Sequence, residues 1–204
     1  MRAARGTLAA LGLLPEGWRT GDRVAHLLVE GRCTGQCASC AAACVVRGEG
    51  PERGTWPRIS IPRLTGALHA RSGAFDHAEI AAGAGPGALR ELAAAVTAVA
   101  MCGLPVWAVF PVRSSADVER LTAAGAVRVV LPAGPQVAGR RTARGSIPVA
   151  EVAELARQLH QAYPGRVAVR LMEARGTADE ALAGLERAGV PILTTACGEE
   201  EALV

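Results

Sequence analysis

The chain has 204 residues, of which half are hydrophobic and a fifth are charged, a composition typical of a globular protein and not of a disordered one. Its net charge of +3 comes with 22 basic residues that are all arginine, so lysine-dependent Schiff-base and phosphate chemistry is excluded. Only three Trp, one Tyr and two Phe accompany the arginines, and the basic residues are spread along the chain, which argues against a nucleic-acid partner.

Residues 1–23 are expected to form a lead-in to a single main domain that spans residues 24–204. The stretch MRAARGTLAALGLL has the basic start and short apolar run of a secretory signal, but Pro15-Glu16-Gly17-Trp18 follows in place of a small-residue cleavage site. We therefore expect a short helix that stops at Pro15. No apolar stretch reaches the roughly 18 residues that a membrane-spanning helix needs, which predicts that there is no membrane partner.

From residue 25 onward, short apolar runs alternate with helical patterns. The expected strands are residues 25–30, 77–82, 105–112, 127–131, 166–172 and 191–196, and the expected helices are residues 61–70, 88–102, 114–124, 148–162 and 177–188. Six strand-then-helix units with β-branched runs favour an α/β fold with a parallel sheet covered by helices. An incomplete barrel and a doubly wound sheet both fit this pattern, and both bind ligands at the carboxyl ends of the strands.

Four of the six cysteines lie within 12 residues, directly after the first expected strand. Cys33, Cys37 and Cys40 have the spacing C-x3-C-x2-C, and Cys44 follows. Three thiolates in one loop can hold a 4Fe–4S cluster and leave one iron open to another ligand. Bunched cysteines also indicate a reducing compartment rather than a disulfide framework, so we expect a cytoplasmic protein.

Three alternatives to an open cluster remain. A structural zinc site uses four ligands, usually as two separated pairs, whereas here Cys102 and Cys197 are distant and the four histidines are isolated. Cys44 lies four positions after Cys40 and could serve as a fourth ligand, which would close the site. The cysteines could also be plain structural thiols.

The cysteine motif, placed after the first strand, resembles that of the radical S-adenosylmethionine (radical SAM) enzymes. The resemblance implies that the open iron of a 4Fe–4S cluster chelates SAM and that an electron, supplied by a donor such as ferredoxin or flavodoxin, yields a 5′-deoxyadenosyl radical. It also implies a partial (β/α)6 TIM-like barrel with outer helices, and the count of six units agrees with this. The stretches 32–41 and 53–57 look closest to biotin synthase and split lipoyl synthase, which implies cofactor biosynthesis on a small-molecule substrate.

The resemblance assigns Ser39, Gly83, Ala84 and Gly85 to the SAM site, with two departures from the family's pattern. Ser39 stands where the family usually has an aromatic residue, and Gly83-Ala84-Gly85-Pro86 stands where it has Gly-Gly-Glu-Pro. The glycines still permit close backbone approach to a ligand. A second hypothesis is therefore a non-catalytic iron–sulfur or zinc subunit with a degenerate SAM site. A partner subunit that completes the lid is possible in either case.

Other polar residues stand at or near the ends of the expected strands: Arg113, Ser114, Gln136, Arg170, Glu173, Thr194 and Thr195. An arginine within a strand, such as Arg170 or Arg128, must face solvent or meet a carboxylate or a ligand. Cys102 is expected in the core, and Cys197 at the open end of the sheet. With Cys102 at the wrong end, too few thiolates remain for an auxiliary cluster, which predicts one cluster per chain.

Overall fold

The computed structural model describes residues 1–14, 23–29, 56–83, 85–134, 147–172 and 179–195. Its elements are β1 (Arg2–Ala3), α1 (Arg5–Ala10), β2 (Val24–Val29), α3 (Ile61–Ala70), the 3-10 turn η1 (Ser72–Ala74), β3 (His77–Ala82), α4 (Ala88–Ala100), β4 (Val106–Val109), α5 (Ser115–Ala123), β5 (Ala126–Gly134), β6 (Ile147–Pro148), α6 (Val149–Ala162), β7 (Val167–Met172), α7 (Asp179–Arg187) and β8 (Ile192–Thr195). All six expected strands and all five expected helices are present, and β3 and α3 have the expected bounds.

The described strands form one open sheet in the order β1-β2-β3-β4-β5-β7-β8, and β6 pairs with β5. Strands β2 to β8 pair in parallel, whereas β1 is antiparallel to β2. The expected α/β fold with a mostly parallel sheet is therefore confirmed. Because the order of these strands follows the chain, the described sheet lacks the reversal that defines a doubly wound fold.

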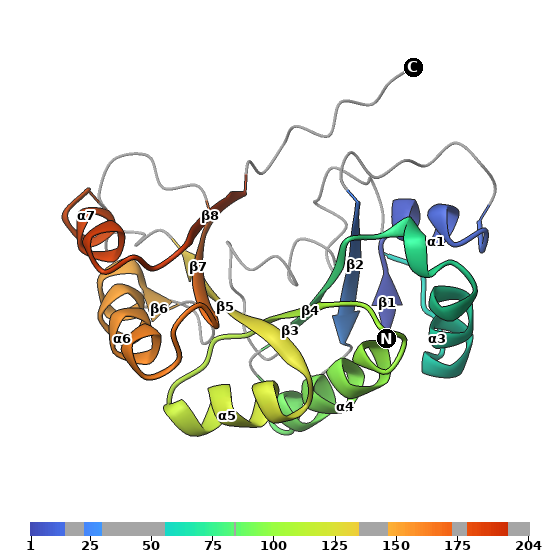
Figure 1. The fold of residues 1–204 in the computed structure, drawn as a ribbon, viewed down its shortest axis with the longest axis horizontal. Helices are drawn as coiled ribbons and strands as arrows, with labels where there is room; N and C mark the ends of the chain where they lie inside the picture. The colour runs from blue at the N-terminus through green and yellow to red at the C-terminus, as the bar shows by residue number, and fades with distance from the viewer. Residues whose placement is uncertain (15–22, 30–55, 84, 135–146, 173–178, 196–204) are drawn as a thin grey trace, which may run out of the picture.

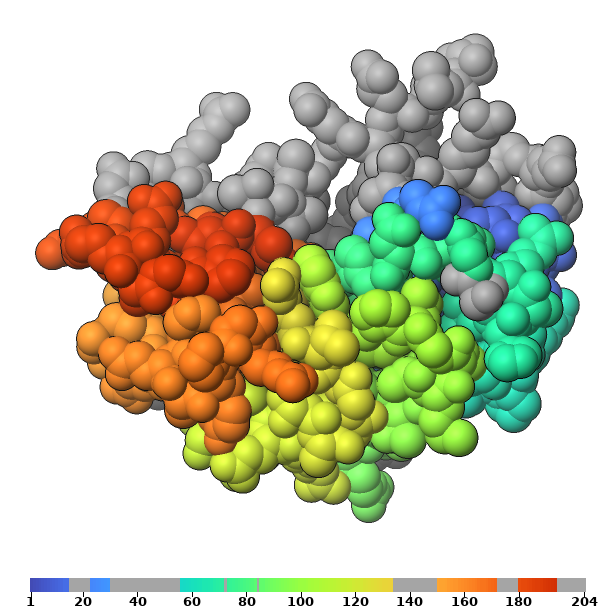
Figure 2. All heavy atoms as spheres, in the orientation of Figure 1, coloured from blue at the N-terminus to red at the C-terminus, as the bar shows by residue number. Residues whose placement is uncertain are grey.

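Helices α3 to α7 follow one another along one side of the sheet, which curves away from them (Figure 1). In the space-filling view they form an outer layer in chain order, from α3 at one end to α7 at the other (Figure 2). Apolar side chains that alternate along the strands, such as Leu27, Ile80 and Val129, pack into one core with Leu92 and Leu121 of these helices. None of the helices in the described ranges is long and apolar enough to cross a membrane.

We call the helix-covered side of the sheet the outer face and the opposite side the inner face. A small apolar cluster of Val109, Val130 and Ala168 lies on the inner face, with Ala81, Trp107 and Leu193 packed against it. Strand alternation and register place further side chains on the inner face, among them His26, Leu28, His77, Glu79, Arg128 and Arg170. Polar and charged residues of the described strands therefore gather on the inner face.

The N-terminal residues, expected as a lead-in, belong to the sheet. Strand β1 pairs with the middle of β2, and the Oγ1 atom of Thr7 accepts a hydrogen bond of 3.0 Å from the backbone N–H of His26. Helix α1 ends at Ala10 rather than at Pro15, just before Gly12, whose φ of +69° is a conformation that favours glycine. The N-terminal segment thus covers the edge of the sheet beside β2.

Candidate functional site

The carboxyl ends of the parallel strands define one edge of the sheet, which we call the C-terminal edge. At this edge, Val29 at the end of β2 is the register partner of Ala82 at the end of β3. The cysteine motif starts four residues after Val29 in the sequence, and Gly83 directly follows Ala82. Val29, four residues before the cysteine motif, and Ala82, directly before the glycine turn, therefore lie on adjacent strands at this edge.

Most of the residues predicted for the site lie outside the described residues. These are Cys33, Cys37, Ser39, Cys40, Ala84, the possible further ligands Cys44 and Cys197, and the polar residues Gln136 and Glu173. Within the described residues, no group of three or more His, Cys, Asp or Glu side chains is placed to hold a metal ion. The ligand set of the predicted cluster thus remains a prediction.

Gly83 and Gly85, the described part of the predicted SAM turn, join β3 to α4. The Gly85 N–H donates to the Gly83 carbonyl at 3.0 Å, and the Ala88 N–H donates to the Gly85 carbonyl at 3.1 Å. Gly87 precedes α4 with a φ of +80°, which explains a glycine there. The turn therefore offers backbone carbonyls and no side chain at positions 83 and 85.

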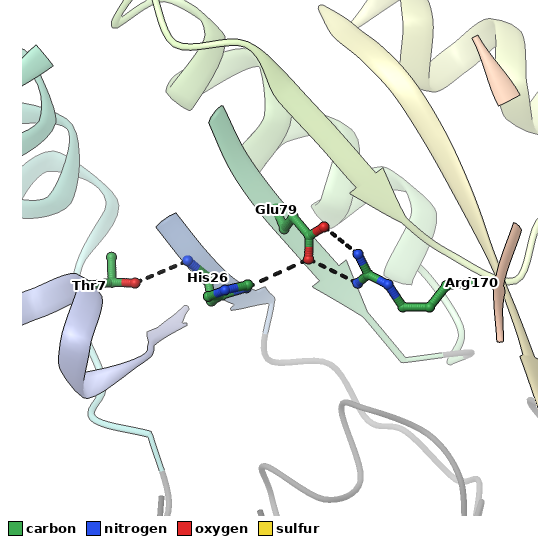
Figure 3. Close-up of polar contacts among 4 residues, drawn as sticks. All are labelled: Thr7, His26, Glu79 and Arg170. Atoms are coloured by element: carbon green, nitrogen blue, oxygen red, sulfur yellow. Dashed lines mark hydrogen bonds and ion pairs between the residues drawn. The ribbon is translucent and has the colours of Figure 1, made fainter. Parts of the chain in front are cut away.

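An ion pair crosses the inner face between Glu79 of β3 and Arg170 of β7. The Arg170 Nη1 atom donates to Glu79 Oε2 at 2.9 Å, and Arg170 Nη2 donates to Glu79 Oε1 (Figure 3). The Glu79 side chain is only 10% exposed, and the Arg170 side chain is 15% exposed. An arginine within a strand was expected to face solvent, a carboxylate or a ligand, and Arg170 meets a carboxylate. The bidentate geometry of this pair is among the stronger hydrogen-bonded arrangements.

The Glu79–Arg170 contact also reports on the shape of the sheet. Strands β4 and β5 lie between β3 and β7, so the two residues are three strand spacings apart, or about 14 Å across a flat sheet. Register separates them further, because Glu79 aligns through Trp107 with Arg128, whereas Arg170 aligns with Pro132, four residues further along β5. Side chains of a strand stand roughly perpendicular to the sheet, so on a flat sheet these two would not meet. Their contact requires a concave inner face, in agreement with the curvature in Figure 1.

His26 of β2 lies on the other side of Glu79. Its Nδ1 atom is 3.6 Å from Glu79 Oε2, and His26 and Glu79 are register partners on adjacent strands. The imidazole is 29% exposed, more than either member of the Glu79–Arg170 pair, and it forms an ion pair only when protonated. Glu79 is thus shared between a permanent cation and a titratable side chain (Figure 3).

The pKa of Glu79 is the net result of opposing effects. Burial raises it, but the nearby His26 side chain, the hydrogen bonds from Arg170 and the charges of both residues outweigh burial and lower it from 4.5 to about 2. Glu79 is therefore an ionised carboxylate in the interior throughout the neutral range.

This lowered pKa predicts an acid-dependent loss of stability. A carboxyl group whose pKa is lower in the folded state stabilises the fold fully above its unfolded pKa, and this contribution is lost as the pH falls toward the folded value. For Glu79 the loss falls between about pH 4.5 and 2 and is on the order of 3 kcal/mol. Urea unfolding across this range measures it. The paired variant Glu79→Gln/Arg170→Met should show a flatter profile, and an equally steep one would contradict the assignment.

A second inner-face group consists of His77, Trp107 and Arg128 from three adjacent strands. The rings of His77 and Trp107 stack with centroids 4.1 Å apart, and the Arg128 Cζ atom lies 4.6 Å from the centroid of the Trp107 ring. Because β4 lies between β3 and β5, Trp107 stands between the other two side chains. Arg128 thus meets an aromatic face, an environment that the sequence interpretation did not consider.

The remaining predicted residues that the structure describes are Cys102, Arg113, Ser114, Thr194 and Thr195. Cys102 is partly buried at the end of α4, with Sγ 3.6 Å from the Thr65 carbonyl oxygen, and burial raises the pKa of its thiol. Ser114 precedes α5 as expected, but its side chain makes no capping hydrogen bond, and Asp117 instead accepts from the Arg113 N–H at 2.7 Å. Thr194 and Thr195 end β8.

Sequence reasoning missed Glu79, His26, His77 and Trp107 as inner-face residues. For His77 and Glu79 the signal is present in the run His77-Ala78-Glu79 of β3, where polar residues alternate with an apolar one. Such alternation places His77 and Glu79 on one face of the strand. The alternation does not reveal the partner of either residue.

Comparisons with known proteins leave the family of this chain open. The sequence matches no family model. No curated protein matches it. One similar solved structure is the BexX/CysO complex of Amycolatopsis orientalis, with a TM-score of 0.43 and 16% sequence identity over 94% of this chain and 74% of that one. A TM-score of this size assigns neither a fold family nor a function.

Proposed function

We propose that this protein is a radical SAM enzyme that holds one 4Fe–4S cluster through Cys33, Cys37 and Cys40. The observation that carries the proposal is the C-x3-C-x2-C spacing, which starts four residues after the first parallel strand of the sheet. Three thiolates are the donor set that suits a cluster with one open iron. The resemblance to biotin synthase and split lipoyl synthase favours a small-molecule substrate in cofactor biosynthesis, with ferredoxin or flavodoxin as electron donor in the cytoplasm.

A partial (β/α)6 barrel is the fold that we infer for this activity. Three observations support it: parallel strands in chain order, helices along one face, and an inner face concave enough for the Glu79–Arg170 contact. The strands that precede the cysteine motif and the glycine turn then end at the C-terminal edge, which is where barrels of this type bind their ligands.

The glycine turn fits part of a SAM molecule. The Gly83 and Gly85 carbonyls each accept one hydrogen bond within the turn, and a carbonyl oxygen has a second lone pair for an ammonium group. The absence of side chains at both positions permits close approach of a ligand to the backbone. When bound, cluster and SAM supply radical chemistry, while the protein supplies binding, orientation and exclusion of water.

The second candidate function is a non-catalytic subunit that keeps a cluster, or a zinc ion, without SAM chemistry. The specific observation in its favour is Gly85, which stands where the family has a glutamate, so the turn offers a SAM ammonium no carboxylate. Cys44 adds to this alternative because a fourth thiolate would leave no iron open to SAM.

Anaerobic reconstitution followed by a SAM cleavage assay tests the proposal. We expect about four irons per chain and formation of 5′-deoxyadenosine, or of an alternative cleavage product, with dithionite and SAM. The control variant with Cys33, Cys37 and Cys40 replaced by Ala should lose both. A reconstituted cluster that never turns over SAM would show that the enzyme proposal is wrong.

Replacing Cys44 by Ala separates the two candidates. If three cysteines hold the cluster, the iron content and absorption spectrum of Cys44→Ala should match those of the wild type. Loss of the cluster would identify Cys44 as a fourth ligand and favour the non-catalytic subunit. Zinc in place of iron after purification would also favour that candidate.

A further inference from the structure

On the described inner face, positively charged side chains outnumber negatively charged ones. Arg128 and Arg170 are permanent cations, and Glu79 is the carboxylate that faces them from the described strands. His26 and His77 can only add positive charge. This part of the inner face is therefore complementary to an anionic ligand rather than to a cationic one.

Arg170 has hydrogen-bonding capacity beyond its ion pair. A guanidinium carries five N–H donors, and the two hydrogen bonds to Glu79 use one N–H each of Nη1 and Nη2. The described residues offer no acceptor to its other donors. The side chain keeps 15% of its surface exposed, so a small molecule can reach it.

Arg170 is also placed where a ligand would arrive. It lies two residues before the end of β7, and its register partners are Pro132 of β5 and Leu193 of β8. The next inner-face layer, further from the C-terminal edge, is closed by the apolar side chains of Val130 and Ala168. A ligand therefore approaches Arg170 from the C-terminal edge, where parallel sheets of α/β proteins bind their ligands.

We propose that Arg170 binds the anionic group, a carboxylate or a phosphate, of a small molecule that enters the inner face from the C-terminal edge. Glu79 holds the guanidinium in position and competes with the ligand for it. Bidentate geometry suits carboxylate and phosphate equally, so the shared chemistry is an oxyanion. The identity of the molecule rests on the proposed function, whereas the anion site itself does not.

Titration with inorganic phosphate tests the site directly. Three proteins are compared at constant ionic strength, because salt alone screens surface charges: the wild type, Glu79→Gln and Glu79→Gln/Arg170→Met. Glu79→Gln removes the competing negative charge and keeps the side-chain shape, so it should bind phosphate at least about tenfold more tightly than the wild type. The double variant should show no saturable binding by calorimetry.

Two outcomes would overturn the proposal: equal phosphate binding by all three proteins, or no binding by any of them. If Glu79→Gln does not fold, the wild type and the double variant decide the question. Phosphate must then raise the Tm of the wild type in a saturable manner and leave that of the double variant unchanged. A phosphate response in the double variant would refute a role for Arg170.

A second titration identifies the source of the anion. The reconstituted wild type and double variant are titrated with SAM and with 5′-methylthioadenosine, which lacks the carboxylate. A loss of SAM affinity in the double variant, with methylthioadenosine unaffected, assigns the site to the carboxylate of SAM. Unchanged affinity for both, together with the phosphate result, assigns it to an anionic substrate. Phosphate binding needs neither cluster nor SAM cleavage, so the two proposals can fail separately.

Discussion

Replacing Arg170 by Met is expected to lower the free energy of unfolding by about 3 to 5 kcal/mol, because it leaves the Glu79 carboxylate buried without its permanent counterion. In the folded variant the pKa of Glu79 should rise, since burial is then opposed only by His26. Stability of Arg170→Met should therefore increase as the pH falls from 7 toward 5, a range in which Glu79 contributes no pH dependence to the wild type. Urea unfolding followed by circular dichroism measures both effects.

The double variant Glu79→Gln/Arg170→Met is the matched control for this prediction. Removing both charges removes their desolvation cost as well as their attraction, so the double variant should unfold within about 1 kcal/mol of the wild type. The difference between the single and double variants isolates the cost of the unpaired carboxylate. If Arg170→Met is as stable as the double variant at pH 7, the carboxylate is not buried and the described pair is a surface contact.

The sheet and its helices were predictable from the sequence because their signals are local. The run from Val24 to Val29 is short and nearly continuously apolar, and the helix from Ile61 to Ala70 has its apolar residues at helical spacing, so the predicted bounds are close to the observed ones. Strand β1 has two residues and is held by long-range pairing with β2 and by a bridge from Arg2 to Arg58, which no local pattern encodes. Strand β6 is equally short, and its second residue, Pro148, was expected to begin the following helix.

The residues of the candidate site also divide into those that a local sequence pattern reveals and those that it does not. Cys33, Cys37 and Cys40 were recognisable because a ligand loop is defined by spacing within a few residues. The Glu79–Arg170 pair joins residues 91 positions apart and depends on the curvature of the sheet. The sequence could mark Arg170 as a cation that needs a partner, but it could not choose Glu79 among the acidic residues. Long-range pairing of this kind follows from the fold and not from a motif.

The Trp107 stack is the other inner-face feature with a large expected effect. Trp107 packs against the Val109, Val130 and Ala168 cluster, its ring stacks on His77, and the guanidinium of Arg128 lies over it. Truncation to Ala removes the apolar contacts, the aromatic pair and the cation–π contact together. We expect Trp107→Ala to lower the free energy of unfolding by about 3 kcal/mol, the lower end for a truncated aromatic residue because Trp107 is only half-buried.

Two control variants test whether the loss of stability comes from the packing of the Trp107 ring. Trp107→Phe keeps an aromatic ring between His77 and Arg128 and should cost less than about 1.5 kcal/mol. Met101→Ala changes a large apolar residue that is 82% exposed and should stay within about 0.5 kcal/mol of the wild type. Circular dichroism is the suitable probe, because the substitution removes one of the three tryptophans and so changes the fluorescence by itself. If Trp107→Ala unfolds within 1 kcal/mol of Met101→Ala, the stack does not stabilise the inner face, and the apolar cluster alone must close the layer beneath Arg170.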